Sequence, residues 1–220
     1  DVSGQDFSFT QPNSGAEVEI RPNDQAATIH WENNGTPQGS ETIDFSLSRG
    51  TFVGSGKSTT TAQTDTNGDA TVTIQSADAG PATISAAAPG GSPSGSQSIE
   101  FVATQVDNVT LQADPSTIGP NETSELTAVV TDPSGNLVKN KTINFSLDDV
   151  TGGTLTTAQA TTDSQGRATT TYEATSTTSA QDKIQVTATE KGTLKSDTAS
   201  LTVSAEPRSG ARTPRAHATS

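Results

Sequence analysis

The 220-residue sequence contains no cysteine and no methionine, and only 4% of its residues are aromatic. Without cysteine the chain has no disulfide, no thiolate nucleophile and no zinc–thiolate centre. Hydrophobic residues make up 29% of the chain, so any core must be thin, and the sustained apolar stripes of a helical bundle are missing. Because no run of about 18 apolar residues occurs, no segment is expected to cross a membrane as a helix.

Positive charge is also scarce in this chain. Twelve lysines and arginines stand against 25 aspartates and glutamates, which gives a formal net charge of −13. Such a charge repels the phosphate backbone of nucleic acids and the surface of anionic membranes, and it keeps an exposed protein soluble. We therefore expect no nucleic acid and no inserted membrane lipid among the partners of the folded body.

Motifs of catalysis and cofactor binding do not occur in the sequence. There is no nucleophile elbow and no glycine-rich phosphate loop between a strand and a helix. His30 stands beside Trp31 in a predicted strand, and a triad would need a serine and a carboxylate brought to it from elsewhere. We interpret His30 as a surface residue of its strand. The sequence thus predicts a protein that is not an enzyme, without catalytic residues or cofactors.

Two segments of the chain occur twice. Thr42–Leu47 returns 100 positions later as Thr142–Leu147, and Thr64–Ala70 returns 98 positions later as Thr162–Ala168. Two matches in the same order at nearly one offset indicate one structural unit used twice. A period near 100 residues is too long for a solenoid turn and suits a whole small domain.

Apolar and polar residues alternate in short runs that are separated by glycine, proline, asparagine and aspartate. Each run has the length of a strand and gives it one apolar face, and β-branched residues dominate. In the first half the alternating residues are Phe7, Phe9, Val18, Ile20, Ala27, Ile29, Trp31, Ile43, Phe45, Leu47, Val72, Ile74, Ile84, Ala86, Ile99 and Phe101. In the second half they are Val109, Leu111, Leu126, Ala128, Val130, Ile143, Phe145, Leu147, Ala168, Thr170, Tyr172, Ile184, Val186, Ala188, Leu201 and Val203. Roughly seven strands per copy are typical of an antiparallel sandwich.

The predicted domains are residues 1–105 and 106–205. Residues 103–108 contain neither glycine nor proline, and so short a link is expected to hold the domains end to end. Residues 206–220 differ from both domains, because they combine arginine and proline with almost no large apolar residue. We interpret this basic tail as flexible, or as a segment that orders only against a partner.

Three motifs in the second half, taken in order, resemble one known family. They are Asp132–Val138 in a turn between strands, Ile143–Ser146 in the next strand, and Thr162–Ala168 before a later strand. The closing strand around Ile184–Ala188 fits the same pattern. On these residues the second half is similar to the bacterial Ig-like domains of group 1, the type found in invasin and intimin.

The resemblance covers residues 106–205 and, less closely, 1–105, where Asn33–Pro37 replaces the usual Asp–Gly–Asn turn. It implies an all-β chain of two tandem immunoglobulin-like antiparallel β-sandwiches. Domains of this family usually form rod-like stalks of surface adhesins, filaments or virion appendages, which present another component at the tip. The lectin-like tip of invasin has no counterpart in the residues of this chain.

Four residues are expected to shape the repeated turns: Asp65, Gly68, Asp163 and Gly166. The aspartate can accept a bond from the backbone two residues on, and the glycine supplies a positive φ. Asp65, Asn67 and Asp69 also present oxygen atoms at alternate positions, as half of a calcium loop does. The second copy has Gln165 and Arg167 instead, and no bidentate glutamate follows, so we predict structural turns and no metal.

Asn-x-Ser/Thr sequons are a further set of candidate sites. They would be glycosylated if the protein were secreted by an archaeon or a eukaryote, although several are expected by chance in so threonine-rich a chain. A fifth sequon, at Asn144, falls in the middle of a predicted strand and is the least suited to modification. The four candidates are Asn34, Asn108, Asn121 and Asn140.

These observations favour an extracellular stalk or adhesion module, secreted or on a cell or virion surface. Its partners would be neighbouring domains or subunits, or a host receptor. The alternative is a self-assembling subunit of a filament or a virion decoration protein, a homo-oligomer in which residues 1–10 add a strand to a neighbour's sandwich edge. A third possibility is a carbohydrate- or protein-binding module with Trp31 and Tyr172 as exposed platforms.

Overall fold

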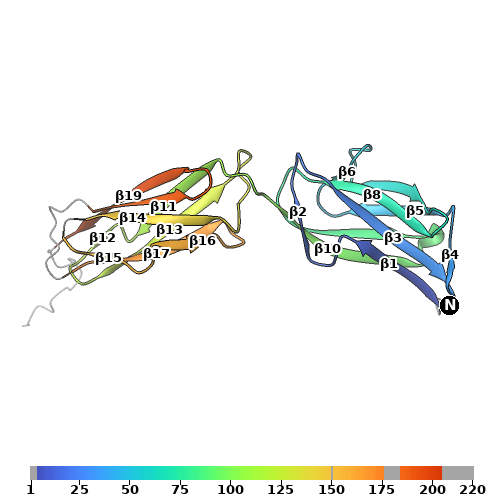
Figure 1. Cartoon of the computed structure of the whole chain (residues 1–220), viewed down its shortest axis with the longest axis horizontal. Coiled ribbons are helices and arrows are strands. Elements are labelled where there is room, and N and C mark those ends of the chain that lie inside the picture. Colours follow the sequence, from blue (N-terminus) through green and yellow to red (C-terminus); the bar gives the residue numbers. More distant parts are fainter. Residues whose placement is uncertain (1–3, 150, 176–183, 205–220) are drawn as a thin grey trace, which may run out of the picture. The chain divides into compact units, whose positions relative to one another are not determined.

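The computed structural model describes residues 4–149, 151–175 and 184–204 of the chain (Figure 1). Almost all regular structure in these residues is strand, and the short 3-10 helix η1 (Pro89–Gly91) is the exception. No helix in this part of the chain has the length and apolar character needed to span a bilayer. The tail predicted at 206–220 lies outside the described residues.

Contacts between Cα atoms divide the chain into two compact units. The first unit contains the residues up to Gln105 together with Thr131–Lys139, and the second contains Val106–Val130 and the residues from Asn140 onward. The loop at 131–139 therefore clusters with the first unit, although the sequence repeat places it in the second copy.

Two sheets form the first unit. One sheet has the order β1 (Gln5–Gln11), β3 (Gln25–Asn33), β8 (Asp69–Gln75) and β6 (Thr51–Phe52), with β4 (Thr36–Pro37) paired to β3. The other has the order β2 (Ala16–Glu19), β10 (Ser94–Val102), β9 (Gly80–Ala87), β5 (Thr42–Leu47) and β7 (Thr59–Gln63). Neighbouring strands are antiparallel apart from β2 and β10, which run parallel.

The second unit repeats this topology. Its first sheet has the order β11 (Asn108–Asp114), β13 (Thr123–Thr131), β17 (Arg167–Glu173) and β15 (Thr154–Leu155). Its second sheet has the order β12 (Thr117–Ile118), β19 (Ser196–Val203), β18 (Ile184–Glu190), β14 (Thr142–Asp148) and β16 (Gln159–Thr161), again with β12 parallel to β19. In both units the N-terminal segment crosses from one sheet to the other. The chain is therefore all-β, with two immunoglobulin-like sandwiches in tandem.

The core of each sandwich comes from one side of its alternating strands. In β5, Ile43, Phe45 and Leu47 are buried while the residues between them are exposed. Phe45 packs edge-to-face against Phe9 and Phe52, with ring centroids 6.5 and 6.4 Å apart. Burial of one such side chain stabilises the fold by about 1.5–3 kcal/mol. A small number of aromatic and β-branched residues can therefore stabilise the sandwich although its core is thin.

Lys139 anchors the loop at 131–139 within the first unit. Its Nζ lies 2.9 Å from Oε1 of Glu17 in β2 and 2.7 Å from Oε2 of Glu100 in β10. Burial lowers the pKa of Lys139, but the hydrogen bonds to Glu100 and Glu17 outweigh it, so the pKa is raised. Beside it, Val138 forms a parallel bridge with Ala103. A single ammonium group thus bridges two carboxylates that come from neighbouring strands.

Replacement of Lys139 by methionine tests this anchor. Methionine keeps much of the apolar stem but leaves Glu17 and Glu100 without their cation. Because both carboxylates are partly exposed, we expect a loss of only about 1 kcal/mol, smaller at high salt. Hydrogen exchange at the amides of residues 131–139 should accelerate. Lys57→Met, at an exposed lysine of the same unit, is the matched control, and equal exchange in both variants would contradict the assignment.

Candidate functional site

An aspartate carboxylate closes the repeated turn in each unit. Oδ1 of Asp65 accepts bonds from the backbone N–H groups two and four residues on, at 2.8 and 3.0 Å. Oδ1 of Asp163 accepts the equivalent pair at 2.8 and 3.0 Å. The hydrogen bonds from the amides of Asp69 and Asn67 hold the pKa of Asp65 below its usual value. Both carboxylates therefore act on the backbone of their own turns.

The glycine of each turn contacts the neighbouring strand through its carbonyl group. The N–H of Trp31 donates to the carbonyl oxygen of Gly68, and that of Val130 donates to Gly166, both at 2.9 Å. Gly68 has φ +81° and Gly166 has φ +66°. A Cβ atom at Gly68 would collide with the backbone oxygen of Trp31. The position therefore requires glycine for its conformation and for its space.

The carboxylates of Asp65 and Asp69, two of the three residues considered as metal ligands, are engaged within the chain. Besides its two amide bonds, Asp65 lies within 3.5 Å of the side-chain nitrogen of Asn67. Asp69 binds the ring of His30. Within residues 4–149, 151–175 and 184–204, no three histidine, cysteine, aspartate or glutamate side chains cluster as a metal site would require. The geometry of this segment fits a turn that supports its own backbone.

His30 lies between two carboxylates on the outer side of β3. Its Nδ1 is 2.7 Å from Oδ1 of Asp69, its direct cross-strand neighbour in β8, and its Nε2 is 3.2 Å from Oε1 of Glu32. The hydrogen bond to Asp69 is the largest influence on the pKa of His30 and raises it, against burial, which lowers it. Both ring nitrogens face acceptors, so neither is left to activate a hydroxyl nucleophile.

The two aromatic residues considered as exposed platforms are placed differently. Tyr172 is fully buried, and its hydroxyl donates to Oδ2 of Asp149 at 2.8 Å, so it offers no exposed platform for a ligand. The alternation of β17 explains this, because Tyr172 shares its inward face with Ala168. Trp31 is half-buried and packs edge-to-face on Phe7, with centroids 5.8 Å apart.

All four candidate glycosylation sites are exposed. Asn34, Asn121 and Asn140 occupy turn positions with φ between 50° and 60°, a conformation that asparagine tolerates better than most residues. Asn108 is exposed at the first position of β11. Accessibility is therefore met at each site, and modification of these asparagines stays a prediction.

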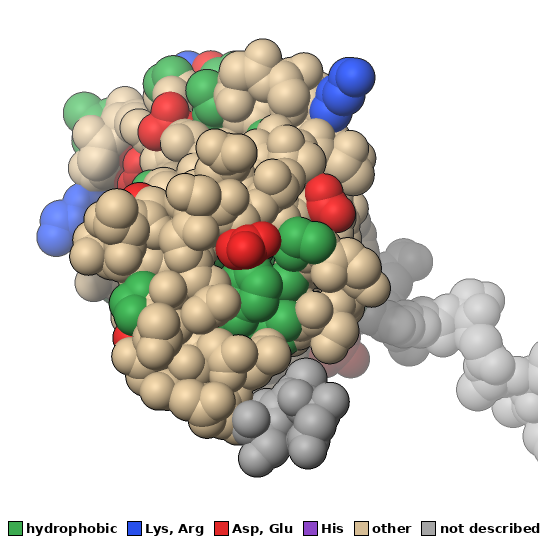
Figure 2. Space-filling model, turned by 90° about the vertical axis from the view of Figure 1, so that its right-hand side faces the viewer, with side chains coloured by type: hydrophobic (Ala, Val, Ile, Leu, Met, Phe, Trp, Pro, Cys, Tyr) green, Lys and Arg blue, Asp and Glu red, His purple; other side chains and the backbone are tan. Residues whose placement is uncertain are grey.

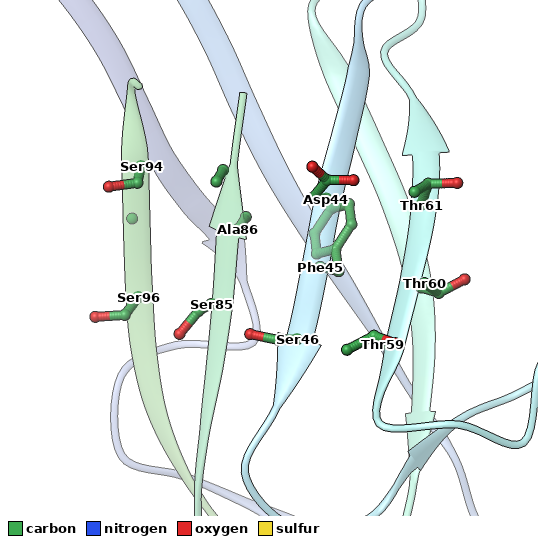
Figure 3. A pocket seen from close by; sticks show the side chains of 12 residues that line it. Asp44, Phe45, Ser46, Thr59, Thr60, Thr61, Ser85, Ala86, Ser94 and Ser96 are labelled. Atoms are coloured by element: carbon green, nitrogen blue, oxygen red, sulfur yellow. The ribbon is translucent and has the colours of Figure 1, made fainter. Parts of the chain in front are cut away.

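A shallow groove of about 750 Å³ lies on the sheet formed by β10, β9, β5 and β7 (Figure 3). Serine and threonine hydroxyls and the carboxylate of Asp44 line it, and Phe45 and Ala86 contribute to its floor. Sequence reasoning missed the groove because its residues are the polar members of ordinary alternating strands.

Figure 2 views the first unit from the end at which β1 begins, where hydrophobic side chains gather near the centre beside acidic ones.

Residues 107–204 match the family model of the bacterial Ig-like domain (group 1). Among solved structures, the E. coli adhesin FdeC is 15% identical with a TM-score of 0.49, over 93% of this chain and 65% of that one. The Yersinia pseudotuberculosis adhesin InvE is 14% identical with a TM-score of 0.43, over 92% of this chain and 59% of that one.

Invasin, described as a bacterial integrin-binding protein, is 19% identical with a TM-score of 0.40, over 90% of this chain and 39% of that one. The chain thus spans less than two thirds of the length of each of these three proteins. No curated protein sequence is significantly similar to this one.

Replacement of Gly68 by alanine should destabilise the first unit by about 2 kcal/mol or more. The left-handed backbone alone costs a non-glycine residue roughly 1–2 kcal/mol, and the contact with the Trp31 carbonyl adds to that. Gly54→Ala is the matched control, because Gly54 has φ +90° and open space around it. Urea unfolding followed by the fluorescence of Trp31, the single tryptophan, measures both. Equal losses in the two variants would contradict a close approach at Gly68.

His30 should stabilise the first unit only at low pH. Because its folded-state pKa is raised above the unfolded value near 6.5, its contribution is fully present below that value and is lost as pH rises through the folded pKa. The free energy of unfolding should therefore differ between wild type and His30→Gln most below pH about 6, and the difference should shrink toward alkaline pH. An NMR titration of the His30 ring in wild type and Asp69→Asn checks the cause. An unchanged midpoint in Asp69→Asn would refute it.

Proposed function

We propose that the chain is a spacer module of a bacterial surface adhesin, since residues 107–204 match the family model of the bacterial Ig-like domain (group 1). The observation that carries this proposal is the repetition of one self-contained sandwich. In each unit the turn aspartate accepts bonds from the backbone of its own turn, the turn glycine accepts one from the neighbouring strand, and the apolar residues fill the unit's core. Such a unit can be added in series.

The polar side chains of the chain support a structural role. The carboxylates of Asp65, Asp163 and Asp149 are occupied by hydrogen bonds that hold loops in place. His30 is enclosed by acceptors. A net charge of −13 favours solubility and resists close approach between like molecules, as a surface-exposed spacer requires.

The proposed location is the bacterial cell surface, and the proposed partners are proteins. They would be neighbouring domains of the same polypeptide and a host receptor engaged by the whole adhesin. The integrin binding named for invasin belongs to that protein. For this chain a receptor contact is part of the proposal. The comparisons lend no support to a filament or virion subunit, and we do not propose one.

Epitope display on yeast tests the spacer role. An epitope fused before residue 1 of the full chain, anchored through residue 220, should bind antibody-coated beads more often than the same epitope on the bare anchor. Replacement of the chain by an unrelated pair of Ig-like sandwiches is the matched control and should keep the binding. Loss of binding in that swap, or self-association of the purified chain in sedimentation between about 1 and 200 μM, would refute a passive monomeric spacer.

A further inference from the structure

The groove of the first unit presents an ordered set of hydrogen-bonding groups that the protein itself does not use. Two rows of four residues cross the four strands, and one row lies at a single level in Figure 3. The rows are Ser96, Ser85, Ser46 and Thr59, and Ser94, Ala87, Asp44 and Thr61. No hydrogen bond among the described residues involves a side chain of either row. Most of the eight are exposed, so this capacity faces solvent.

In the second unit, side chains at the corresponding positions hydrogen-bond to each other. Cross-strand register makes Thr187 and Thr198 the counterparts of Ser85 and Ser96, and these threonines share a hydrogen bond of 2.8 Å. Asn144 is the counterpart of Asp44, and its Oδ1 accepts a bond of 2.7 Å from Gln159. There, these side chains hydrogen-bond to each other. Their counterparts in the first unit form no such pairs.

Charge and composition decide which occupant fits. Asp44 is the one ionisable residue among those that line the groove, and no lysine or arginine accompanies it. A phosphate, a uronic acid or a sulfated sugar would meet an uncompensated carboxylate. A second copy stacked face to face would oppose one Asp44 to another. Phe45 and Ala86, two of the apolar residues that line the groove, are almost fully buried, so they offer little apolar surface to the side chains of a peptide.

Sugar hydroxyls match this surface. Each hydroxyl both donates and accepts, as do the serine and threonine hydroxyls of the two rows, and a carboxylate is a strong acceptor for them. The volume of about 750 Å³ lies within the range of ligand sites and would hold a short oligosaccharide. We propose that the groove over β10, β9, β5 and β7 binds an uncharged oligosaccharide, with Asp44 as its charged acceptor. This binding does not depend on the spacer role.

The test uses the full chain, labelled with ¹⁵N, and follows backbone amide shifts during titration. The probes are mannotriose, cellotriose and chitotriose, with trigalacturonic acid as the charged counterpart. We expect saturable shifts with at least one neutral trisaccharide, centred on the groove residues, and none with the acid. A fluorescently labelled chain on a glycan array extends the search to other neutral glycans.

Two variants transfer the second unit's pairs into the groove, and both should fold because the second unit already carries them. S85T/S96T introduces the threonine pair that Thr187 and Thr198 form in the second unit. D44N/T61Q removes the carboxylate and introduces the amide pair that Asn144 and Gln159 form. Each should weaken binding at least tenfold. T187S/T198S, the reverse change in the second unit, is the matched control and should leave binding unchanged.

Several results would overturn the proposal. One is the absence of amide shifts with all three neutral trisaccharides together with no binding on the array. Another is binding that both groove variants retain. Shifts that map away from the two rows would also overturn it, as would preference for the acidic trisaccharide. Shifts that grow with protein concentration alone would assign the groove to a second copy of the chain. Apart from self-association, which would also refute a monomeric spacer, these outcomes do not bear on whether the chain acts as a spacer.

Discussion

A carboxylate that accepts two backbone amides sets the register of each sandwich. Asp65 holds the turn before β8, and Asp163 holds the turn before β17. The threonine that precedes each aspartate fixes a second segment of backbone. The hydroxyl oxygen of Thr64 accepts a bond from the N–H of Glu41, and that of Thr162 accepts one from the N–H of Lys141, both at 2.9 Å. One short motif thus ties the two sheets together at the start of β5 and of β14. A slip of one residue there would turn every apolar side chain of the strand toward solvent.

That register also explains the chemistry at His30. Once the turn begins β8 at Asp69, cross-strand pairing places Asp69 directly opposite His30. The resulting ion pair is a consequence of strand order and has no counterpart in the second unit, where Val129 pairs with Arg167. The repeated part of the design is therefore the backbone turn, and the side chains that project outward from it are free to differ.

The sequence was most informative where a physical period or a turn rule applied. Alternation located the long strands, because the burial of one face dictates their pattern, as in Ile43–Leu47. It did not locate β7 or β16, whose residues are polar or small and which hydrogen-bond at a sheet edge. The pairing of His30 with Asp69, 39 positions away, depends on tertiary register and could not be read from local composition. Tyr172 follows the alternation rule, since its place on the face of Ala168 already indicated burial. The position of the loop at 131–139 depends on Lys139 meeting two glutamates from distant strands.

Different energetic demands on the two faces of a sheet explain how one duplicated fold can acquire different surfaces. A buried residue such as Phe45 or Phe145 is costly to change, because a smaller side chain leaves a cavity. Substitution of an exposed residue on the same strand typically changes the free energy of unfolding by no more than about 0.5 kcal/mol. Asp44 and Asn144 can therefore differ while the backbone beneath them stays the same. On this face the first unit has hydroxyl groups without a partner side chain, whereas the second unit pairs its side chains by hydrogen bonds. Differences in binding between the two sandwiches are therefore to be sought on the outer faces of their sheets, which stability leaves unconstrained.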